Sequence, residues 1–328
     1  MRTKRITAQG TGIYHCMSRT VNGQALFKLR EMEVLRKMIH QVADFSGVEV
    51  LTYCLMNNHF HVLVRVCPEA QVSDSELMRR YRVLYAKPSL YQTASVSVME
   101  QELRDGGAEA DLIRQKLLAR MNDISAFMKT LKQRFSTWFN KTHERFGPLW
   151  ADRFKSVLVE GKGNALQTMA AYIDLNPVRA GLVKDPKDYR FCGYAEAVSG
   201  QKKAQRALKF LTFGAYEASS NEALASYREL LFGKGSAAVE HAANIDREAA
   251  VRVLKKEQGV LPSAVLLRCR IRYFTEGAVL GSREFVQSHA EHWKRSTGRK
   301  HRYKPQNIPA EANASLTVLK NLRGSVYS

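Results

Sequence analysis

Two histidines stand one residue apart in a short stretch that is otherwise apolar and rich in β-branched residues. This stretch, His59 to Val66, predicts a β-strand, in which alternate side chains point to opposite faces. Two imidazoles side by side on a strand can bind one divalent metal ion, although the pattern alone also fits two ordinary surface histidines. One face carries His59, His61, Leu63 and Arg65, and the other, which we expect to be the core face, carries Phe60, Val62, Val64 and Val66.

A tyrosine and an asparagine form a second candidate site far downstream. Tyr172 and Asn176 are four residues apart, at the end of a helix that we predict over Ala165 to Leu175, ahead of Pro177. Residues with this spacing project from the same helical face. The amide oxygen of Asn176 is an acceptable ligand for a hard cation. A tyrosine hydroxyl beside such a cation could attack a phosphodiester. The alternative is an ordinary helix end that packs Tyr172 at the edge of the core.

The charge of the chain points to a polyanion as partner. Its 328 residues include 51 Lys and Arg against 31 Asp and Glu, a net charge of +20, and 45% are hydrophobic, which suffices for a real core. Nucleic acid is the leading partner and an anionic membrane surface the alternative. No apolar run approaches the roughly 18 residues of a membrane span. Because neither a basic amphipathic helix nor a lipid anchor is present, we expect no membrane partner.

The positive charge is unevenly distributed along the chain. Residues 1–66 and 125–200 each carry a net +5, whereas residues 67–123 are nearly neutral and residues 201–328 carry a net +11. The near-neutral stretch, with helical character over Val98 to Met121, is typical of a helical insertion. We therefore expect a domain over 1–200 with an insertion at 67–123, a helical connector over 201–244 and a basic DNA-contacting extension over 245–328.

Short apolar segments and helical periodicities alternate in the first 200 residues, which predicts an α+β domain. The two residues Asn57 and Asn58 fit the turn of a β-hairpin, because asparagine tolerates a positive φ angle. Strands are predicted over Gly12 to Ser18, Val48 to Met56, His59 to Val66 and Phe154 to Val159, and helices over Leu29 to Phe45, Ile124 to Lys141 and Ala165 to Leu175.

The five cysteines are scattered, and no C-x-x-C pair is present. A zinc knuckle or ribbon is therefore not expected. With no export signal visible, we interpret the cysteines as reduced, mostly buried apolar residues of a cytoplasmic protein.

The C-terminal third is the most basic part. Arg268 to Phe274 alternates bases with apolar residues, which predicts a half-buried strand, and Arg283 to Trp293 predicts a helix. The following run, Lys294 to Lys304, can hold a DNA backbone without reading its sequence. We interpret His15, His289 and His292 as structural or surface residues, since no further ligand pattern accompanies them.

Several blocks together resemble one protein family. His59-Phe60-His61 resembles the His-hydrophobic-His motif of the HUH endonucleases. With its neighbours Asn57 to Val64, and with the block Tyr172 to Gly181, it closely resembles the REP-associated tyrosine transposases. Supporting blocks are Tyr14 to Arg19 and Gly147 to Ser156. The resemblance covers roughly residues 8 to 200, apart from the insertion.

The resemblance implies a fold and a chemistry. It implies a ferredoxin-like antiparallel sheet flanked by helices, a metal site at His59 and His61 completed by Asn176, and Tyr172 as the nucleophile. Members cut single-stranded DNA beside hairpins formed by repetitive extragenic palindromes. Cleavage leaves a covalent 5′-phosphotyrosine and a free 3′ hydroxyl that can rejoin strands. Mg²⁺ or Mn²⁺ suits two imidazoles and a carbonyl oxygen, whereas Zn²⁺ is not expected without thiolates.

Two other interpretations remain open at this point. One is a DNA-binding or regulatory protein that retains the fold without mobility, and the other is a rolling-circle replication initiator, which shares the HUH chemistry but not the Tyr172 block. Either a monomer or a homodimer is compatible with the sequence, and a DNA enzyme would be associated with the nucleoid. Arg65 shares the histidine face and could contact phosphate, and bases interleaved with aromatics or gathered in the basic run suit a DNA backbone. The candidate DNA contacts are Arg65, Arg134, Arg153, Lys155, Arg179, Lys294, Arg295, Arg299, Lys300, Arg302 and Lys304.

Overall fold

A single mixed sheet organises the molecule. The computed structural model describes residues 5–68, 71–85, 90–232, 273–297, 305–308 and 316–320. Within them, seven strands are hydrogen-bonded in the order β2-β3-β1-β4-β5-β7-β6. The strands are β1 (Gly12–Arg19), β2 (Val48–Leu55), β3 (His59–Val66), β4 (Lys155–Val159), β5 (Gly277–Gly281), β6 (Gln306–Ile308) and β7 (Leu316–Lys320).

The first four strands form the predicted ferredoxin-like core. β1 lies between β3 and β4, β3 lies between β1 and β2, and all three pairings are antiparallel. The β2–β3 hairpin turns through Asn57 and Asn58, as expected, and the backbone N–H of Met56 donates to the carbonyl of His59 at 2.8 Å. The α+β fold class and the four core strands are confirmed.

Strands from the C-terminal third extend this core sheet. β5 runs parallel to β4, through the pairs Leu158–Val279 and Val159–Leu280, and β7 is antiparallel to β5. The described sheet is therefore larger than the small sheet that we expected. The strand predicted over Arg268 to Phe274 falls mostly outside the described residues. Its last two residues, Tyr273 and Phe274, are wrongly assigned, because they lie in a helical turn and the strand begins at Gly277.

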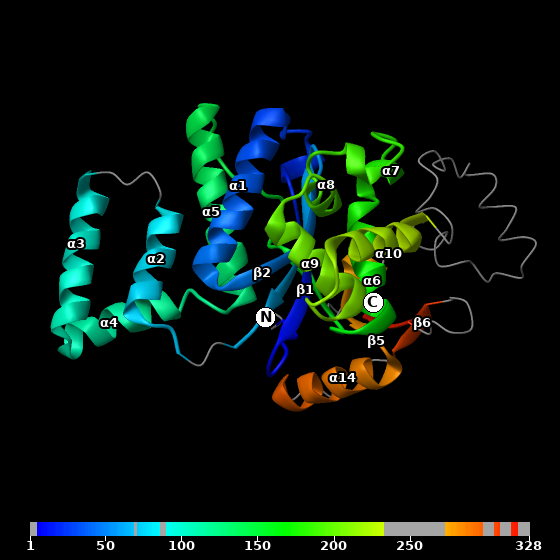
Figure 1. Ribbon diagram of the computed structural model, residues 1–328. Helices are drawn as coiled ribbons and strands as arrows, with labels where there is room; N and C mark the ends of the chain where they lie inside the picture. The colour runs from blue at the N-terminus through cyan, green and yellow to red at the C-terminus, as the bar shows by residue number, and fades with distance from the viewer. Residues whose placement is uncertain are drawn as a thin grey trace, which may run out of the picture.

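Helices cover both faces of the sheet (Figure 1). α1 and α5 contribute to one apolar core with Phe60, Val62 and Val64, and α6, α9 and α10 contribute to a second core that includes Leu63. The longer helices are α1 (Leu29–Ser46), α2 (Asp74–Leu84), α3 (Leu90–Asp105), α4 (Gly107–Leu118), α5 (Ile124–Thr142), α6 (Gly163–Asp174), α9 (Lys202–Phe213), α10 (Ser220–Phe232) and α14 (Arg283–Thr297). Short helices are η1 (Val21–Gly23), α7 (Asn176–Arg179), η2 (Pro186–Asp188), α8 (Gly193–Val198) and α13 (Tyr273–Glu276).

The second core corrects one expectation about the histidine strand. We expected only the Phe60 face of β3 to be buried. Leu63 is fully buried and His61 is 1% exposed, because α6 packs across this face. The middle of β3, from Phe60 to Val64, is therefore buried on both faces.

Local signals set the limits of the predicted helices. α1 ends at Gly47, whose φ of 64° is readily adopted by glycine, and α5 begins where the Asp123 carboxylate accepts from the N–H of Ala126 at 2.6 Å. Both helices extend one residue beyond their predicted C-terminal ends. None of the described helices is long and apolar enough to span a membrane.

The segment that we predict to be a helical insertion contacts α1 and lies away from the sheet (Figure 1). α2, α3 and α4 form the lobe drawn in cyan at the left of Figure 1. Met78, Leu103 and Ala110 make its small separate core, and Arg79 joins it to Asp44 of α1 at 2.7 Å. The helical character predicted over 98–121 is confirmed as parts of α3 and α4.

Three of the cysteines behave as expected. Cys16, Cys54 and Cys192 are buried, Cys67 is partly buried, and none of these four is in a disulfide. Burial raises the pKa of the Cys16 thiol to about 12, so it stays protonated at neutral pH. Cys269 lies outside the described residues.

Candidate active site

The sheet and α6 bring the candidate histidines and tyrosine together within one chain. His59 and His61 lie on β3 with their ring centroids 5.1 Å apart. The ring centroid of Tyr172, on α6, is 6.0 Å from that of His61, and the two rings meet edge to face. α6 packs directly against β2 and β3, which explains the contact. The spacing of residues that are distant in sequence is thus set by one helix–sheet contact.

A third histidine, His15 of β1, completes the cluster. Its Nε2 lies 2.8 Å from Nδ1 of His61, and its Nδ1 lies 2.8 Å from the carbonyl oxygen of Phe274. The His15 and His61 rings stack with centroids 5.0 Å apart. We had interpreted His15 as structural without a partner. The signal that could have found it is the pairing of β1 with β3, which places His15 and His61 on the same face of neighbouring strands.

Burial keeps this pair of imidazoles uncharged. His15 is 1% exposed, and burial lowers its pKa to about 4. The pKa of His61 is also well below its usual range, because of burial first and the neighbouring His15 and His59 next. Neutral imidazole is the form that binds a metal ion.

His59 is held by the turn that precedes it. Its Nδ1 lies 2.6 Å from the side-chain oxygen of Asn58. The amide nitrogen of Asn58 donates to the carbonyl of Gly23 at 2.9 Å, and the carbonyl of Asn58 accepts from the N–H of Thr20 at 2.9 Å. The turn asparagine therefore positions the histidine next to it.

Two side chains stack on the candidate nucleophile. Tyr172 is 6% exposed. The guanidinium carbon of Arg179 lies 3.9 Å from the centroid of its ring, and the ring of Phe274 has its centroid 4.7 Å away. Arg179 and Phe274 therefore cover part of the Tyr172 ring, which also contacts His15 and His61.

Asn176 stabilises the turn between α6 and α7. Its side-chain oxygen accepts from Nη2 of Arg179 at 2.8 Å, and its nitrogen donates to the carbonyls of Ile173 and Tyr172 at 3.1 and 3.2 Å. This is the helix-end role that the sequence left open. The amide oxygen retains a second lone pair, and its assignment as a metal ligand stays a prediction.

Two imidazoles and one amide oxygen are donors of the kind that a divalent cation accepts. In the part of the chain that the structure describes, no three His, Cys, Asp or Glu side chains are grouped to hold a metal ion. The donors that the sequence predicts for such an ion are His59, His61 and Asn176. Nδ1 of His59 lies against Asn58 and Nδ1 of His61 lies against His15, so coordination of a metal ion would use Nε2 of each ring. Such an incomplete shell leaves room for phosphate oxygens.

The candidate DNA contacts lie in different places. Arg65 is neutralised by Glu49 at 3.2 Å and also contacts Tyr216, and Arg134 donates to the carbonyl of Leu84 on the α5 side of the sheet. Arg179 lies at the tyrosine. Exposed side chains are those of Arg153, Lys155, Lys294 and Arg295, and the remaining candidates, Arg299, Lys300, Arg302 and Lys304, lie outside the described residues.

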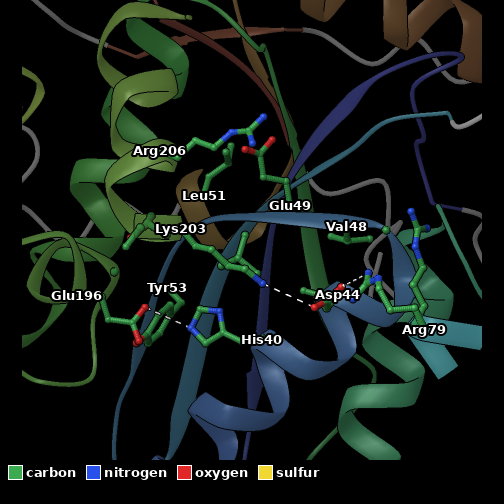
Figure 2. A pocket seen from close by; sticks show the side chains of 17 residues that line it. His40, Asp44, Val48, Glu49, Leu51, Tyr53, Arg79, Glu196, Lys203 and Arg206 are labelled. Carbon is green, nitrogen blue, oxygen red and sulfur yellow. Dashed lines mark hydrogen bonds and ion pairs between the residues drawn. The ribbon is translucent and has the colours of Figure 1, made fainter. Parts of the chain in front are cut away.

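Two of the cavities lined by described residues lie away from this cluster. One, of about 510 Å³, runs along the outer edge of β2 between α1 and α9 and is lined by His40, Glu196 and Lys203 among others (Figure 2). The other, of about 670 Å³, lies beside α14 and includes Arg65 and Arg295. His59, His61 and Tyr172 line neither of them.

Comparison with known proteins supports the family resemblance. The family model described as "Transposase IS200 like" matches residues 9–90, the segment from β1 through β3 to α2, which holds His15, His59 and His61. Over this segment the chain is similar to the IS200-like transposases. A solved structure described as the REP-associated tyrosine transposase bound to a REP hairpin is similar at 16% identity and a TM-score of 0.39, covering 61% of this chain and 87% of that one. At that TM-score, we infer nothing about function from the structural similarity. No curated protein is significantly similar to the chain.

Proposed function

We propose that this chain is a metal-dependent single-stranded DNA endonuclease and strand transferase that acts at hairpin, REP-like sequences. The observation that carries the proposal is the contact of Tyr172 with His61, with ring centroids 6.0 Å apart. A covalent attack on a phosphodiester needs a nucleophile, here a tyrosine hydroxyl, next to groups that can bind a metal ion, here two imidazoles. The transposase family match over residues 9–90 supports DNA as the substrate.

In the proposed reaction, the hydroxyl oxygen of Tyr172 attacks the scissile phosphorus. The new bond to Tyr172 forms as the bond between phosphorus and the 3′ oxygen breaks. The phenol loses one proton and the leaving 3′ oxygen gains one, so the step balances. The 5′ phosphate stays on Tyr172 and the other end becomes a 3′ hydroxyl. Because the linkage conserves the energy of the phosphodiester, a 3′ hydroxyl can later reverse the step and join strands without ATP.

His59, His61 and Asn176 would hold the cation, Mg²⁺ or Mn²⁺, which polarises the scissile phosphate when bound. The residues of the chain then have distinct tasks. The two imidazoles bind in their neutral form, Arg179 orients the ring of Tyr172, and the packing of α6 on β3 keeps the tyrosine in line with the histidines.

Basic residues away from the site would hold the rest of the DNA. Lys294 and Arg295 are exposed on α14, and Arg153 and Lys155 are exposed at the start of β4. Such groups attract the phosphate backbone without reading bases. We extend the proposal to a protein of the nucleoid, acting as a monomer or a homodimer, with residues 1–200 as the catalytic domain and 245–328 as the extension that grips DNA.

The direct test is the capture of the covalent intermediate. Purified protein is incubated with Mg²⁺ or Mn²⁺ and single-stranded hairpin oligonucleotides taken from the DNA that flanks its own gene. A protein–DNA adduct on a denaturing gel is expected for the unaltered chain and not for Tyr172→Phe. An adduct that persists in Tyr172→Phe would refute the role of this residue.

A second candidate is a DNA-binding regulatory protein that retains the fold without cleavage. The low exposure of Tyr172, 6%, favours it. The same assay separates the two functions, because hairpin binding without any adduct, with either metal ion, identifies the regulatory protein.

A further inference from the structure

We propose that His15 and Asn58 are positioning residues that make His61 and His59 present the same ring nitrogen, Nε2, to the divalent cation. This inference rests on the metal site of the proposed function. It adds two residues that hold the ligands rather than touch the metal, and it assigns a direction to every hydrogen bond behind them.

The direction of the hydrogen bonds behind His61 follows from one backbone carbonyl. The oxygen of Phe274 can only accept, so Nδ1 of His15, 2.8 Å away, must donate. His15 is 1% exposed, and burial without a carboxylate contact disfavours the imidazolium, so its Nε2 carries a lone pair. That Nε2 lies 2.8 Å from Nδ1 of His61, which must therefore donate. His61 then has its own lone pair on Nε2.

A different backbone carbonyl sets which ring nitrogen of His59 carries the proton. The oxygen of Gly23 accepts from the amide nitrogen of Asn58 at 2.9 Å, and this contact sets which end of the amide faces the histidine. The amide oxygen of Asn58 lies 2.6 Å from Nδ1 of His59 and can only accept. Nδ1 of His59 therefore carries a proton, so in the neutral imidazole, which is the form that binds a metal ion, the lone pair is also on Nε2.

The hydrogen-bond networks behind His61 and His59 have the same arrangement. Each begins at a backbone carbonyl outside β3, passes through one side chain and ends at Nδ1 of a β3 histidine. A backbone carbonyl cannot reverse its role, so the tautomers are set by the fold. Metal-binding histidines are oriented and made more basic by an acceptor at their second nitrogen, and loss of such an acceptor typically weakens metal binding by roughly 10- to 100-fold.

The hydrogen bonds through His15 also connect the C-terminal segment to the candidate site. Phe274 supplies the carbonyl that anchors His15, and its ring packs on Tyr172 with centroids 4.7 Å apart. Its side chain is 1% exposed. One residue of α13 thus touches both the histidine side and the tyrosine side of the candidate site.

A matched pair of variants separates the two hydrogen bonds of His15. In His15→Gln the longer amide reaches the place of Nε2, where its oxygen can accept from His61. In His15→Asn the shorter amide reaches the place of Nδ1 and can only replace the donor to Phe274. Mn²⁺ affinity, measured by electron paramagnetic resonance without DNA, should change by less than about threefold in His15→Gln and fall by roughly 10- to 100-fold in His15→Asn.

The equivalent pair at Asn58 makes the same distinction. Asn58→Asp keeps an oxygen that accepts from Nδ1 of His59 and should retain Mn²⁺ binding. Asn58→Leu removes that acceptor and should weaken Mn²⁺ binding by roughly 10- to 100-fold. Urea unfolding of all four variants controls for loss of fold.

The tautomers themselves are read in the metal-free protein. Nitrogen-15 spectra of the imidazoles should show the proton of both His59 and His61 on Nδ1. A proton on Nε2 of either residue overturns the inference, as does equal Mn²⁺ affinity for His15→Gln and His15→Asn. Absence of Mn²⁺ binding by the unaltered protein overturns the metal site as well, whereas Mn²⁺ binding without a DNA adduct contradicts the proposed function and leaves the positioning roles supported.

Discussion

The guanidinium group of Arg179 lies over the ring of Tyr172, with its carbon 3.9 Å from the ring centroid. Its Nη2 also donates to the carbonyl of Tyr172 and to the side-chain oxygen of Asn176, both at 2.8 Å. One side chain from α7 therefore fixes the orientation of the phenol and ties it to the turn that follows α6. We had placed Arg179 among residues that contact DNA, and its position indicates that it also holds the candidate nucleophile.

Arg179→Lys tests this positioning role. Lysine keeps the charge but cannot stack a planar group on the ring while forming two hydrogen bonds. We expect the rate of covalent adduct formation to fall by roughly tenfold or more, since about 1.4 kcal/mol in the barrier corresponds to a tenfold change in rate. Hairpin affinity, measured in parallel by fluorescence anisotropy, should change by less. Equal losses of affinity and rate would identify Arg179 as a DNA contact only.

Local sequence patterns were enough to predict much of the fold. The β2–β3 hairpin, α1, α5 and α6 were predicted from periodicity and stop signals such as Gly47, because these depend on neighbouring residues. His59 and His61 were selected by their spacing on one strand. Their proximity to Tyr172 was expected only from the family resemblance, because no local pattern encodes the packing of α6 on β3.

The features that were missed depend on long-range pairing. The partnership of His15 with His61 requires the register of β1 against β3, in which Met17 pairs with His61. β5 is five residues long, and it joins the sheet through a parallel pairing of Leu280 with Val159. A short segment of this kind has little periodicity of its own, so the sequence did not reveal that the C-terminal third reaches the site.

The hydrogen bonds made to a buried carboxylate at the end of α6 should contribute strongly to stability. Asp174 is fully buried at the end of α6 and accepts from the hydroxyl of Tyr227 at 2.6 Å, from Thr52 at 2.8 Å and from the N–H of Tyr194 at 3.2 Å. Removing one donor leaves a buried acceptor poorly satisfied. Tyr227→Phe should lower the free energy of unfolding by roughly 1.5–3 kcal/mol, measured by urea denaturation.

Tyr189→Phe is the matched control for this prediction. The Tyr189 hydroxyl donates to the neutral carbonyl of Leu55 at 2.7 Å. A hydrogen bond between neutral groups contributes only about 1 kcal/mol. A loss in Tyr227→Phe no larger than in Tyr189→Phe would argue against an ionised Asp174.

The edge cavity of β2 contains a group that should make the fold sensitive to acid. Glu196 binds His40 at 3.2 Å and Arg36 at 2.6 Å (Figure 2 draws the contact with His40). Burial raises the pKa of Glu196, but its hydrogen bonds, including those with His40 and Arg36, outweigh burial and lower the pKa to about 2. Because this pKa lies below that of the unfolded chain, the stabilisation is complete above about pH 4.5 and is lost as the pH falls towards 2.

Glu196→Gln should remove that part of the pH dependence. Between pH 5 and pH 2.5, the free energy of unfolding of the unaltered protein should fall by up to about 2 kcal/mol more than that of the variant, after allowance for solvent screening. Urea unfolding at several pH values measures the difference. Glu33→Gln is the control, because Glu33 forms more exposed ion pairs with Arg36 and Arg190 and should give a smaller effect. Parallel pH curves for Glu196→Gln and the unaltered chain would contradict the prediction.

The salt dependence of DNA binding should separate basic residues that can meet phosphate from those already neutralised. Lys294 and Arg295 are exposed on α14, whereas Arg65 has Glu49 at 3.2 Å and stacks on Phe210. Each phosphate contact to single-stranded DNA contributes about 0.7 to the slope of log affinity against log salt. Lys294→Gln with Arg295→Gln should therefore reduce the slope by roughly 1.4, and Arg65→Gln by much less. A slope that falls with Arg65→Gln and not with the α14 pair would move the DNA path from α14 to the sheet edge at Arg65.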